Sequence, residues 1–332
     1  MILILSSDRD NSTNKVINWL LKWEVPFMRV SILDKFIVEK IVIDKTQSYF
    51  ILKNKNNGQL IDSRKITAFW YRRDKINLYY EGVDEDSSEE LLSVFFKDVN
   101  GYLKTEMTEI FRYLNLILRK IRHINSWFDN QLNKLYALEI AKEVGIEIPK
   151  TIIATNDSHL NDYFDGDNEI VTKGICQGIY IYSEEQNYQV TMPTSIYKST
   201  VENPSQYFPT LFQNKIEKLY ELRIFYFLGR FFTSAIFSQQ NEKTKIDFRN
   251  YDVNYPNRTP PVKLPNALEC KIRLLMEKLN LNSGSIDMVY TTTGEYIFLE
   301  VNPIGLFEQV DIPCNYNIEM EIAKYLKECT TT

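Results

Sequence analysis

The residues with the clearest chemical potential are two carboxylates and an amide in the C-terminal part of the chain: Asp287, Glu300 and Asn302. They lie in two apolar, β-rich runs that flank Thr-Thr-Thr-Gly, a sequence typical of a tight hairpin turn. If Thr293 and Gly294 form a two-residue loop, Asp287 and Glu300 stand directly opposite each other, with Cβ atoms about 5 Å apart. Asn302 follows Glu300 by two residues and therefore faces the same side of the strand.

Two opposed carboxylates repel each other, so this hairpin face needs a cation. Carboxylate and amide oxygens without His or Cys favour Mg²⁺, which commonly binds through one or two carboxylates together with the phosphates of a substrate. The alternative is a solvated hairpin face with ordinary charges. The apolar residues between the polar ones need a buried opposite face, which weakens that alternative. These residues are Ile286, Met288, Leu299 and Val301.

The composition is that of an ordinary globular protein. Of its 332 residues, 44% are hydrophobic and 25% are charged, and the length allows two or three domains. The net charge of −5 argues against a general nucleic-acid-binding protein. No apolar run is long enough for a membrane span, and the opening MILILSS lacks the features of a signal peptide. We therefore expect a cytoplasmic protein with no nucleic-acid or membrane partner.

The few His and Cys residues argue against several common kinds of catalysis. The chain has only His123 and His159, so we expect neither a Ser-His-Asp enzyme nor a His-rich metal site. The four cysteines are far apart and form no C-x-x-C pair, which predicts reduced thiols rather than zinc ligands or disulfides. A catalytic thiol is a weak alternative, because neither His neighbours a Cys in the sequence.

Alternating patterns predict an α/β protein with α+β character in three parts. Residues 1–120 open with a strand, a helix and a strand, which indicates an N-terminal α/β domain. Residues 121–210 combine a helix that stops at Gly145 with several strands. Residues 211–332 are rich in strands, contain the hairpin described above and end in an amphipathic helix.

Several cations precede the hairpin at positions where they could meet phosphates. Lys134 begins a predicted helix, and Lys173 ends a strand just before a glycine-containing loop, which can bring an ammonium group and backbone N–H groups onto phosphate. Arg223 interrupts an otherwise apolar strand. Asp247 and Arg249 face one way if their segment is extended. Each of these residues alone is more typical of a solvated charge or a structural ion pair.

In their order along the chain, these residues resemble the ATP-grasp fold from about residue 125 to 303, with an N-terminal α/β domain in its usual place, a central domain and a C-terminal ATP-grasp domain. In that family two lysines hold the phosphates of ATP, a short hinge binds adenine, and an Asp, a Glu and an Asn hold two Mg²⁺ ions. The resemblance implies that Lys134 and Lys173 bind the phosphates, that the backbone around Gln213, Asn214 and Lys215 binds adenine, and that Glu217 holds the ribose. It further implies that Arg223 lies on the phosphate side and that Asp287, Glu300 and Asn302 hold the metal.

A narrower resemblance comes from AFWYRRD at residues 68–74. Trp-Tyr-Arg-Arg at the end of an N-terminal strand is similar to a signature of graspetide synthetases, which macrocyclise ribosomal peptides. The DFR tripeptide at 247–249 resembles the D-W-R of that group, and VNPIGLFEQV resembles its N-P-x-G-Q-F ending, with Leu306 where Gln is usual. The chain as a whole looks most like the grasp-with-spasm type of peptide maturase.

The adjacent arginines of this signature, Arg72 and Arg73, point to opposite faces of a strand. Only one of them is therefore expected to reach a substrate. Trp70 and Tyr71 fit packing between domains as well as they fit a direct role.

The resemblance implies an ATP-dependent carboxylate ligase. A substrate Asp or Glu side chain would attack the γ-phosphate to give an acyl phosphate and ADP, while Mg²⁺ and the cations offset the negative charge. A Ser or Thr hydroxyl, or a Lys amine, of the same peptide would then close an ω-ester or ω-amide ring. Asp247 would accept a proton in this second step, and Arg249 would hold the acyl phosphate. The implied partners are a precursor peptide with a leader segment and further copies of the chain in a homodimer or higher homo-oligomer.

Three alternatives stay open at this point. An intermolecular ATP-grasp ligase would keep every ATP and metal residue and differ in the acceptor, although the WYRR strand counts against it. A nucleotide-binding regulator without turnover is disfavoured by the intact set of Asp287, Glu300 and Asn302. A purely structural α/β protein would leave the ordered set of residues as a coincidence.

Overall fold

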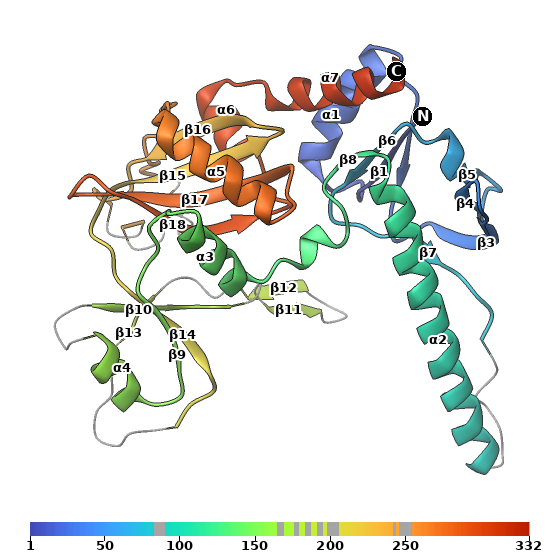
Figure 1. Cartoon of the computed structure of the whole chain (residues 1–332), viewed down its shortest axis with the longest axis horizontal. Coiled ribbons are helices and arrows are strands. Elements are labelled where there is room, and N and C mark those ends of the chain that lie inside the picture. The colour runs from blue at the N-terminus through green and yellow to red at the C-terminus, as the bar shows by residue number, and fades with distance from the viewer. Residues whose placement is uncertain are drawn as a thin grey trace. The chain divides into compact units, whose positions relative to one another are not determined.

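The computed structural model describes residues 1–82, 90–164, 169–175, 179–182, 187–190, 195–197, 206–241, 244–245, 252 and 254–331 (Figure 1). Contacts within the chain divide it into two compact units. Unit 1 comprises Met1–Gln131 and Asn317–Thr332, and unit 2 comprises Leu132–Tyr316. The domain limits predicted at residues 120 and 210 stay predictions. Within the described ranges, no helix combines the length and the hydropathy that a membrane span requires.

Unit 1 is built on a parallel sheet and its first helix: β1 (Ile2–Leu5), α1 (Asn11–Lys22), β2 (Phe27–Val30), β6 (Ala68–Tyr71) and β8 (Arg122–Ile124). The strand order is β2-β1-β6-β8. The apolar runs ILIL and AFWY are buried at every position, as expected for parallel strands covered on both faces. The carboxylate of Asp10 caps α1 by accepting the backbone N–H of Thr13.

A second sheet of unit 1 consists of β3 (Lys35–Ile43), β4 (Ser48–Asn54), β5 (Leu60–Asp62) and β7 (Asn77–Leu78). The strands β3, β4 and β5 pair antiparallel, and β7 adds parallel to β3. A turn that contains Asn57 and Gly58 joins β4 to β5, and Gly58 has a φ of 72°.

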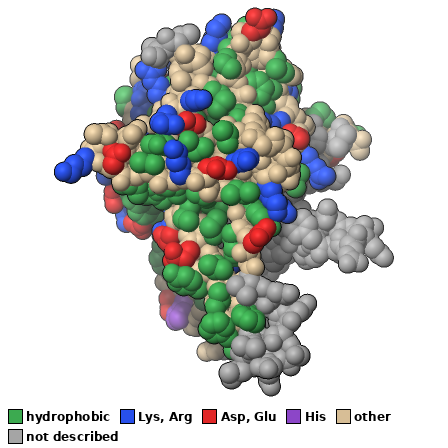
Figure 2. Space-filling view, turned by 90° about the vertical axis from the view of Figure 1, so that its right-hand side faces the viewer, with side chains coloured by type: hydrophobic (Ala, Val, Ile, Leu, Met, Phe, Trp, Pro, Cys, Tyr) green, Lys and Arg blue, Asp and Glu red, His purple; other side chains and the backbone are tan. Residues whose placement is uncertain are grey.

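The remaining helices of unit 1 are the short η1 (Ser63–Lys65) and η2 (Asp129–Gln131) and the longer α2 (Glu90–Arg119) and α7 (Ile318–Thr331). Helix α7 packs against α1, although the sequence analysis grouped this helix with residues 211–332. The C-terminal part of α2 is buried at Leu114 and Leu118, whereas Phe95 and Tyr102 are exposed. In Figure 2 hydrophobic side chains are interspersed with charged ones over the face turned to the viewer.

Unit 2 begins with α3 and a first sheet: α3 (Lys134–Glu143), β9 (Thr151–Ala154), α4 (Asp157–Phe164), β10 (Ile170–Lys173), β13 (Ser195–Tyr197) and β14 (Thr210–Asn214). The sheet is antiparallel in the order β13-β10-β14-β9, and α4 packs on β9. A separate pair is formed by β11 (Ile179–Tyr182) and β12 (Asn187–Val190). Phe164 of α4 and Phe212 of β14 are buried in a small core of this part.

The second sheet of unit 2 and its helices are β15 (Lys218–Phe227), β16 (Arg230–Ile236), α5 (Asn266–Lys278), β17 (Ser283–Thr291), β18 (Tyr296–Asn302) and α6 (Glu308–Cys314). This sheet is antiparallel in the order β16-β15-β17-β18. Figure 1 shows α3 and α5 beside it. The main core joins both helices to the sheet, with Ala141, Ile272 and Ile286 fully buried.

The turn of the β17–β18 hairpin differs from the prediction. Tyr290 pairs with Tyr296, and the N–H of Thr291 donates to the carbonyl of Glu295 at 2.9 Å. The loop therefore has three residues, 292–294, and the predicted two-residue loop is wrong. Three-residue hairpin loops need a left-handed residue at their end, and Gly294 with a φ of 91° supplies it.

A β-bulge compensates for the longer turn. Met288 pairs with Phe298, whereas Asp287 pairs with Glu300, so Leu299 is an extra residue of β18. The predicted pairing of Asp287 with Glu300 is thus confirmed, because the shift at the turn and the shift at the bulge cancel. The predicted burial is wrong at Leu299, which is half-buried, since Phe298 takes the fully buried position.

The left-handed conformation of Gly294 predicts opposite effects of one substitution at two glycines. Gly294→Ala places a Cβ where φ is positive, so we expect it to lower the free energy of unfolding by about 1–2 kcal/mol. Gly101→Ala in α2 meets open space, and alanine should stabilise that helix by about 0.5–1 kcal/mol. Denaturant unfolding of both variants measures the two effects. Equal destabilisation at the two positions would contradict the assigned turn.

Candidate functional site

A hollow in unit 2 brings residues of its two four-stranded sheets together. Its empty space is ≈ 980 Å³, a figure that includes the part open to solvent. Lys173 and Gln213 come from β10 and β14 of the first sheet, and Asp287 and Glu300 come from β17 and β18 of the second. The hollow is therefore bordered by both sheets and belongs to unit 2 alone.

The segment that links the two sheets forms one wall of the hollow. The side-chain amide of Gln213 donates to the hydroxyl of Thr151 at 2.9 Å, which fixes the end of β14 against β9. The ammonium group of Lys215 pairs with Glu169, and this pairing raises the pKa of Lys215. The ammonium group of Lys215 thus has a partner, and both Lys215 and Asn214 border the hollow.

Apolar side chains cover another part of the wall. They include Val171, Ile216 and Leu299, whereas the side chains of Leu222 and Met288 belong to the main core. Leu299 reaches the hollow together with its neighbour Glu300 because of the bulge in β18. An apolar slot of this kind is suited to a flat, partly polar ring.

The floor of the hollow contains an ion pair that the sequence analysis did not identify. Lys218 lies 2.6 Å from the carboxylate of Glu221, and the hydroxyl of Ser238 donates to the same oxygen at 2.9 Å. Glu221 is 6% exposed. Burial raises its pKa, although Lys218 and Ser238 act in the opposite direction. The signal was present in the sequence, because Glu221 shares the face of Arg223 two residues later.

The two opposed carboxylates each have a cation beside them. One guanidinium nitrogen of Arg223 lies 2.5 Å and 2.6 Å from the two oxygens of Asp287, its cross-strand neighbour on β17. The ammonium group of Lys134, at the start of α3, lies 3.1 Å from Glu300. The side chains of Arg223 and Asp287 are 10% and 14% exposed, so this pair is largely removed from water.

Most of the predicted site residues border the hollow directly or through these pairs. Those that line it are Lys173, Gln213, Asn214, Lys215, Glu217, Asp287 and Glu300. Lys134 and Arg223 reach it through Glu300 and Asp287. Asn302 does not line it, since its side-chain oxygen accepts the backbone N–H of Ile304 at 3.1 Å. Asp247 and Arg249 lie outside the described residues.

The donor set of the hollow is compatible with a magnesium ion that arrives with a substrate. Among the described residues, no group of three or more His, Cys, Asp or Glu side chains could hold a metal by itself. Asp287 and Glu300 provide two facing carboxylates. Mg²⁺ is commonly bound by one or two carboxylates plus substrate phosphates, so these residues fit the ion without an all-protein cage.

In unit 1 the arginines of the WYRR segment have different environments. Arg72 is 4% exposed and pairs with Asp10 at 3.1 Å, whereas Arg73 is exposed. Burial alone would raise the pKa of Asp10, but Arg72 and the hydrogen bonds of Thr13 outweigh it and hold that pKa below its ordinary value. Arg72 therefore has a structural partner, and a substrate contact of either arginine stays a prediction.

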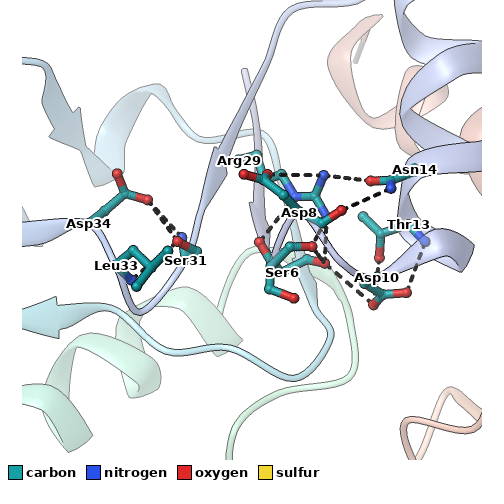
Figure 3. A network of polar contacts seen from close by, with 10 residues as sticks. Ser6, Asp8, Asp10, Thr13, Asn14, Arg29, Ser31, Leu33 and Asp34 are labelled. Carbon is teal, nitrogen blue, oxygen red and sulfur yellow. Dashed lines mark hydrogen bonds and ion pairs between the residues drawn. The ribbon is translucent and has the colours of Figure 1, made fainter. Parts of the chain in front are cut away.

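Asp10 belongs to a polar network after the end of β1 (Figure 3). Arg29 donates to the side chain of Asn14 at 2.7 Å and to the carbonyl of Ser6 at 3.0 Å. These bonds connect β2, the end of β1 and the first turn of α1. The network fixes the loop in which Asp10 holds Arg72.

Comparisons of the sequence find no matching family model and no curated relative, but solved structures match the whole fold. A RiPP-associated ATP-grasp ligase from Chryseobacterium gregarium, in complex with ADP and a leader and core peptide, has 24% identity over 100% of this chain and 97% of its own, with a TM-score of 0.74. The macrocyclase MdnC from Microcystis aeruginosa, bound to the precursor peptide MdnA, has 24% identity over 98% of this chain and 99% of its own, with a TM-score of 0.68.

A third similar structure is the ATP-grasp ligase PsnB with a variant of its minimal precursor, Mg and ADP. It has 12% identity over 99% of this chain and 98% of its own, with a TM-score of 0.69. At these identities the likeness concerns the fold. The chain has the fold of these ATP-grasp structures, as the order of its residues from about 125 to 303 predicted.

The Arg223–Asp287 pair predicts a strong energetic coupling. Arg223→Met or Asp287→Asn leaves the other partner largely buried without this contact, so each change should lower the free energy of unfolding by about 3–5 kcal/mol, while the double variant recovers much of the loss. The exposed pair of Arg273 and Glu269 is the control, with a coupling below about 1 kcal/mol. Additive effects of the Arg223 and Asp287 changes in denaturant unfolding would contradict the pair.

The raised pKa of Glu221 predicts a pH dependence of stability. Its folded pKa lies above the ordinary 4.5, so its contribution is fully present below that pH and is lost as the pH rises through the folded value. Glu221→Gln should therefore flatten the decline of the unfolding free energy above pH 4.5. Denaturant midpoints against pH test this, with exposed Glu139→Gln as the control, and parallel curves for Glu221→Gln and wild type would refute it.

Proposed function

We propose that this chain is an ATP-dependent, ADP-forming carboxylate ligase that macrocyclises a ribosomally made precursor peptide. One observation carries the proposal: a single hollow of an ATP-grasp fold combines the facing carboxylates Asp287 and Glu300 with several cations. The similar structures support the substrate class, since those proteins are RiPP-associated ligases or macrocyclases bound to precursor peptides.

In this proposal the hollow holds ATP. Adenine lies in the apolar slot beside the backbone of residues 213–215, with Glu217 near the ribose. Lys134, Lys173 and Arg223 bind the phosphates, where fixed positive charges stabilise a transferring phosphoryl group. Asp287 and Glu300, with Asn302 next to them on β18, hold magnesium in two sites. Bound Mg²⁺ supplies charge neutralisation on the phosphate oxygens.

The reaction proceeds in two steps. A carboxylate oxygen of the peptide forms a bond to the γ-phosphorus and the bond to the bridging oxygen of ADP breaks, which gives an acyl phosphate. A hydroxyl or amine of the same peptide then attacks the acyl carbon, phosphate leaves, and an ω-ester or ω-amide ring closes. Asp247 takes the proton of the nucleophile and Arg249 holds the acyl phosphate.

The partner of this ligase is a peptide with a leader and a core. The similar enzyme from Chryseobacterium gregarium is seen with both segments. For the quaternary structure we propose a homodimer or a higher homo-oligomer. An intermolecular ligase with the same nucleotide site is the alternative that the experiment must separate.

The test is the intact mass of a Thr/Glu-rich or Lys/Asp-rich peptide encoded beside the gene, incubated with enzyme, ATP and Mg²⁺. Each ring should remove the mass of one water in an ATP-dependent manner, and mild base should open esters but leave amides. Glu300→Gln should slow ADP formation by about two orders of magnitude or more, since it removes a charge from the metal site. Exposed Glu295→Gln on the same hairpin is the control and should retain wild-type turnover.

Two outcomes would contradict the proposal. ADP formation with free amino acids and no loss of peptide mass would identify an intermolecular ligase. Wild-type turnover of the Glu300→Gln variant would show that the metal site lies elsewhere.

A further inference from the structure

The carboxylates assigned to the metal already hold cations of the protein. Both oxygens of Asp287 face one nitrogen of Arg223, at 2.5 Å and 2.6 Å. Glu300 faces the ammonium group of Lys134 at 3.1 Å. A divalent cation that binds either carboxylate therefore has to share it with a positive side chain or displace that side chain.

The position of Lys134 is unfavourable for its own helix. Lys134 is the first residue of α3, and the first turn contains no acidic residue. A cation at this end meets the positive end of the helix dipole, which is unfavourable. The side-chain oxygen of Asn133 accepts the N–H groups of Leu135 and Tyr136, so the cap is satisfied without the lysine. Glu300 offsets the charge of Lys134 in the absence of a ligand.

Three carboxylates of the hollow each have a cation beside them. Three carboxylates, Asp287, Glu300 and Glu221, are matched by three cations, which are Arg223, Lys134 and Lys218. A metal ion alone would leave a surplus of positive charge, and a triphosphate alone would leave a surplus of negative charge. Both surpluses are costly because Arg223, Asp287 and Glu221 are largely buried. When both ligands bind, the metal offsets part of the negative charge of the triphosphate.

From this geometry we propose that the hollow binds divalent metal and nucleotide as one unit through an exchange of ion-pair partners. The metal takes Asp287 and Glu300, and the released Arg223 and Lys134 turn to the phosphates. The inference rests on the proposed function for its assignment of ATP and Mg²⁺ to the hollow. It adds that the protein's own cations compete with the metal until a phosphate chain draws them away.

The exchange makes the two binding equilibria reciprocal. Nucleotide should raise the affinity for metal, and metal should raise the affinity for nucleotide by the same factor. Lys134 is the residue with which this coupling can be separated from stability, because its side chain is 31% exposed. Removal of its charge frees Glu300 for the metal but deprives the phosphates of a partner.

The experiment measures the binding of Mn²⁺ to the full chain by titration calorimetry, with and without a non-hydrolysable ATP analogue. In the wild type the analogue should tighten Mn²⁺ binding about ten-fold or more. Lys134→Met should tighten Mn²⁺ binding several-fold in the absence of the analogue and reduce the coupling. Lys142→Met, which removes an exposed lysine from the last turn of the same helix, is the matched control and should behave as the wild type.

Each result decides the inference. Coupling that is equal in the wild type and the Lys134→Met variant would overturn it, while the proposed ligase function would stand. Absence of analogue binding in the wild type would overturn both. Coupling that depends on Lys134 supports the exchange even if no peptide is cyclised. Thermal unfolding without ligands checks that both variants are folded.

Discussion

The hollow depends on two negative charges that the backbone forces together. Because β17 and β18 are neighbours in an antiparallel sheet, their register places Asp287 opposite Glu300. Like charges in this position destabilise a sheet, and the core on the other face, with Ile286 fully buried, prevents the strands from rotating away. The positive groups follow from this constraint, with Arg223 on the adjacent strand and Lys134 on the helix that contacts β18.

Side-chain alternation explains how much of the site could be predicted. Alternation places Asp287, Glu300 and Asn302 on one face without knowledge of the turn, and the apolar neighbours settle which face is buried. The bulge could not be predicted in this way, because Leu299 is apolar and suits either a core or a binding slot. The predicted pairing of Asp287 with Glu300 is correct although the predicted two-residue loop is wrong. The turn and the bulge each shift the register by one residue in opposite directions, so the alternation of the two faces is unchanged.

An irregularity in one strand explains a contact that the sequence did not predict. The contact between Lys218 and Glu221 depends on an irregularity of β15 between Lys218 and Tyr220, and a regular strand would put residues three apart on opposite faces. The same strand nevertheless carried a readable signal, since Glu221 and Arg223 interrupt an apolar run on one side. The order of the candidate residues along the chain was enough to predict the ATP-grasp fold.

The position of α7 in the sequence has a consequence for folding during synthesis on the ribosome. Unit 1 consists of residues 1–131 completed by α7, which packs on α1, while the whole of unit 2 lies between them in the sequence. Synthesis from the N-terminus therefore delivers all of unit 2 before the last helix of unit 1 emerges. During that interval the part of α1 that α7 later contacts lacks this partner, and apolar surface left uncovered in an incomplete fold favours aggregation.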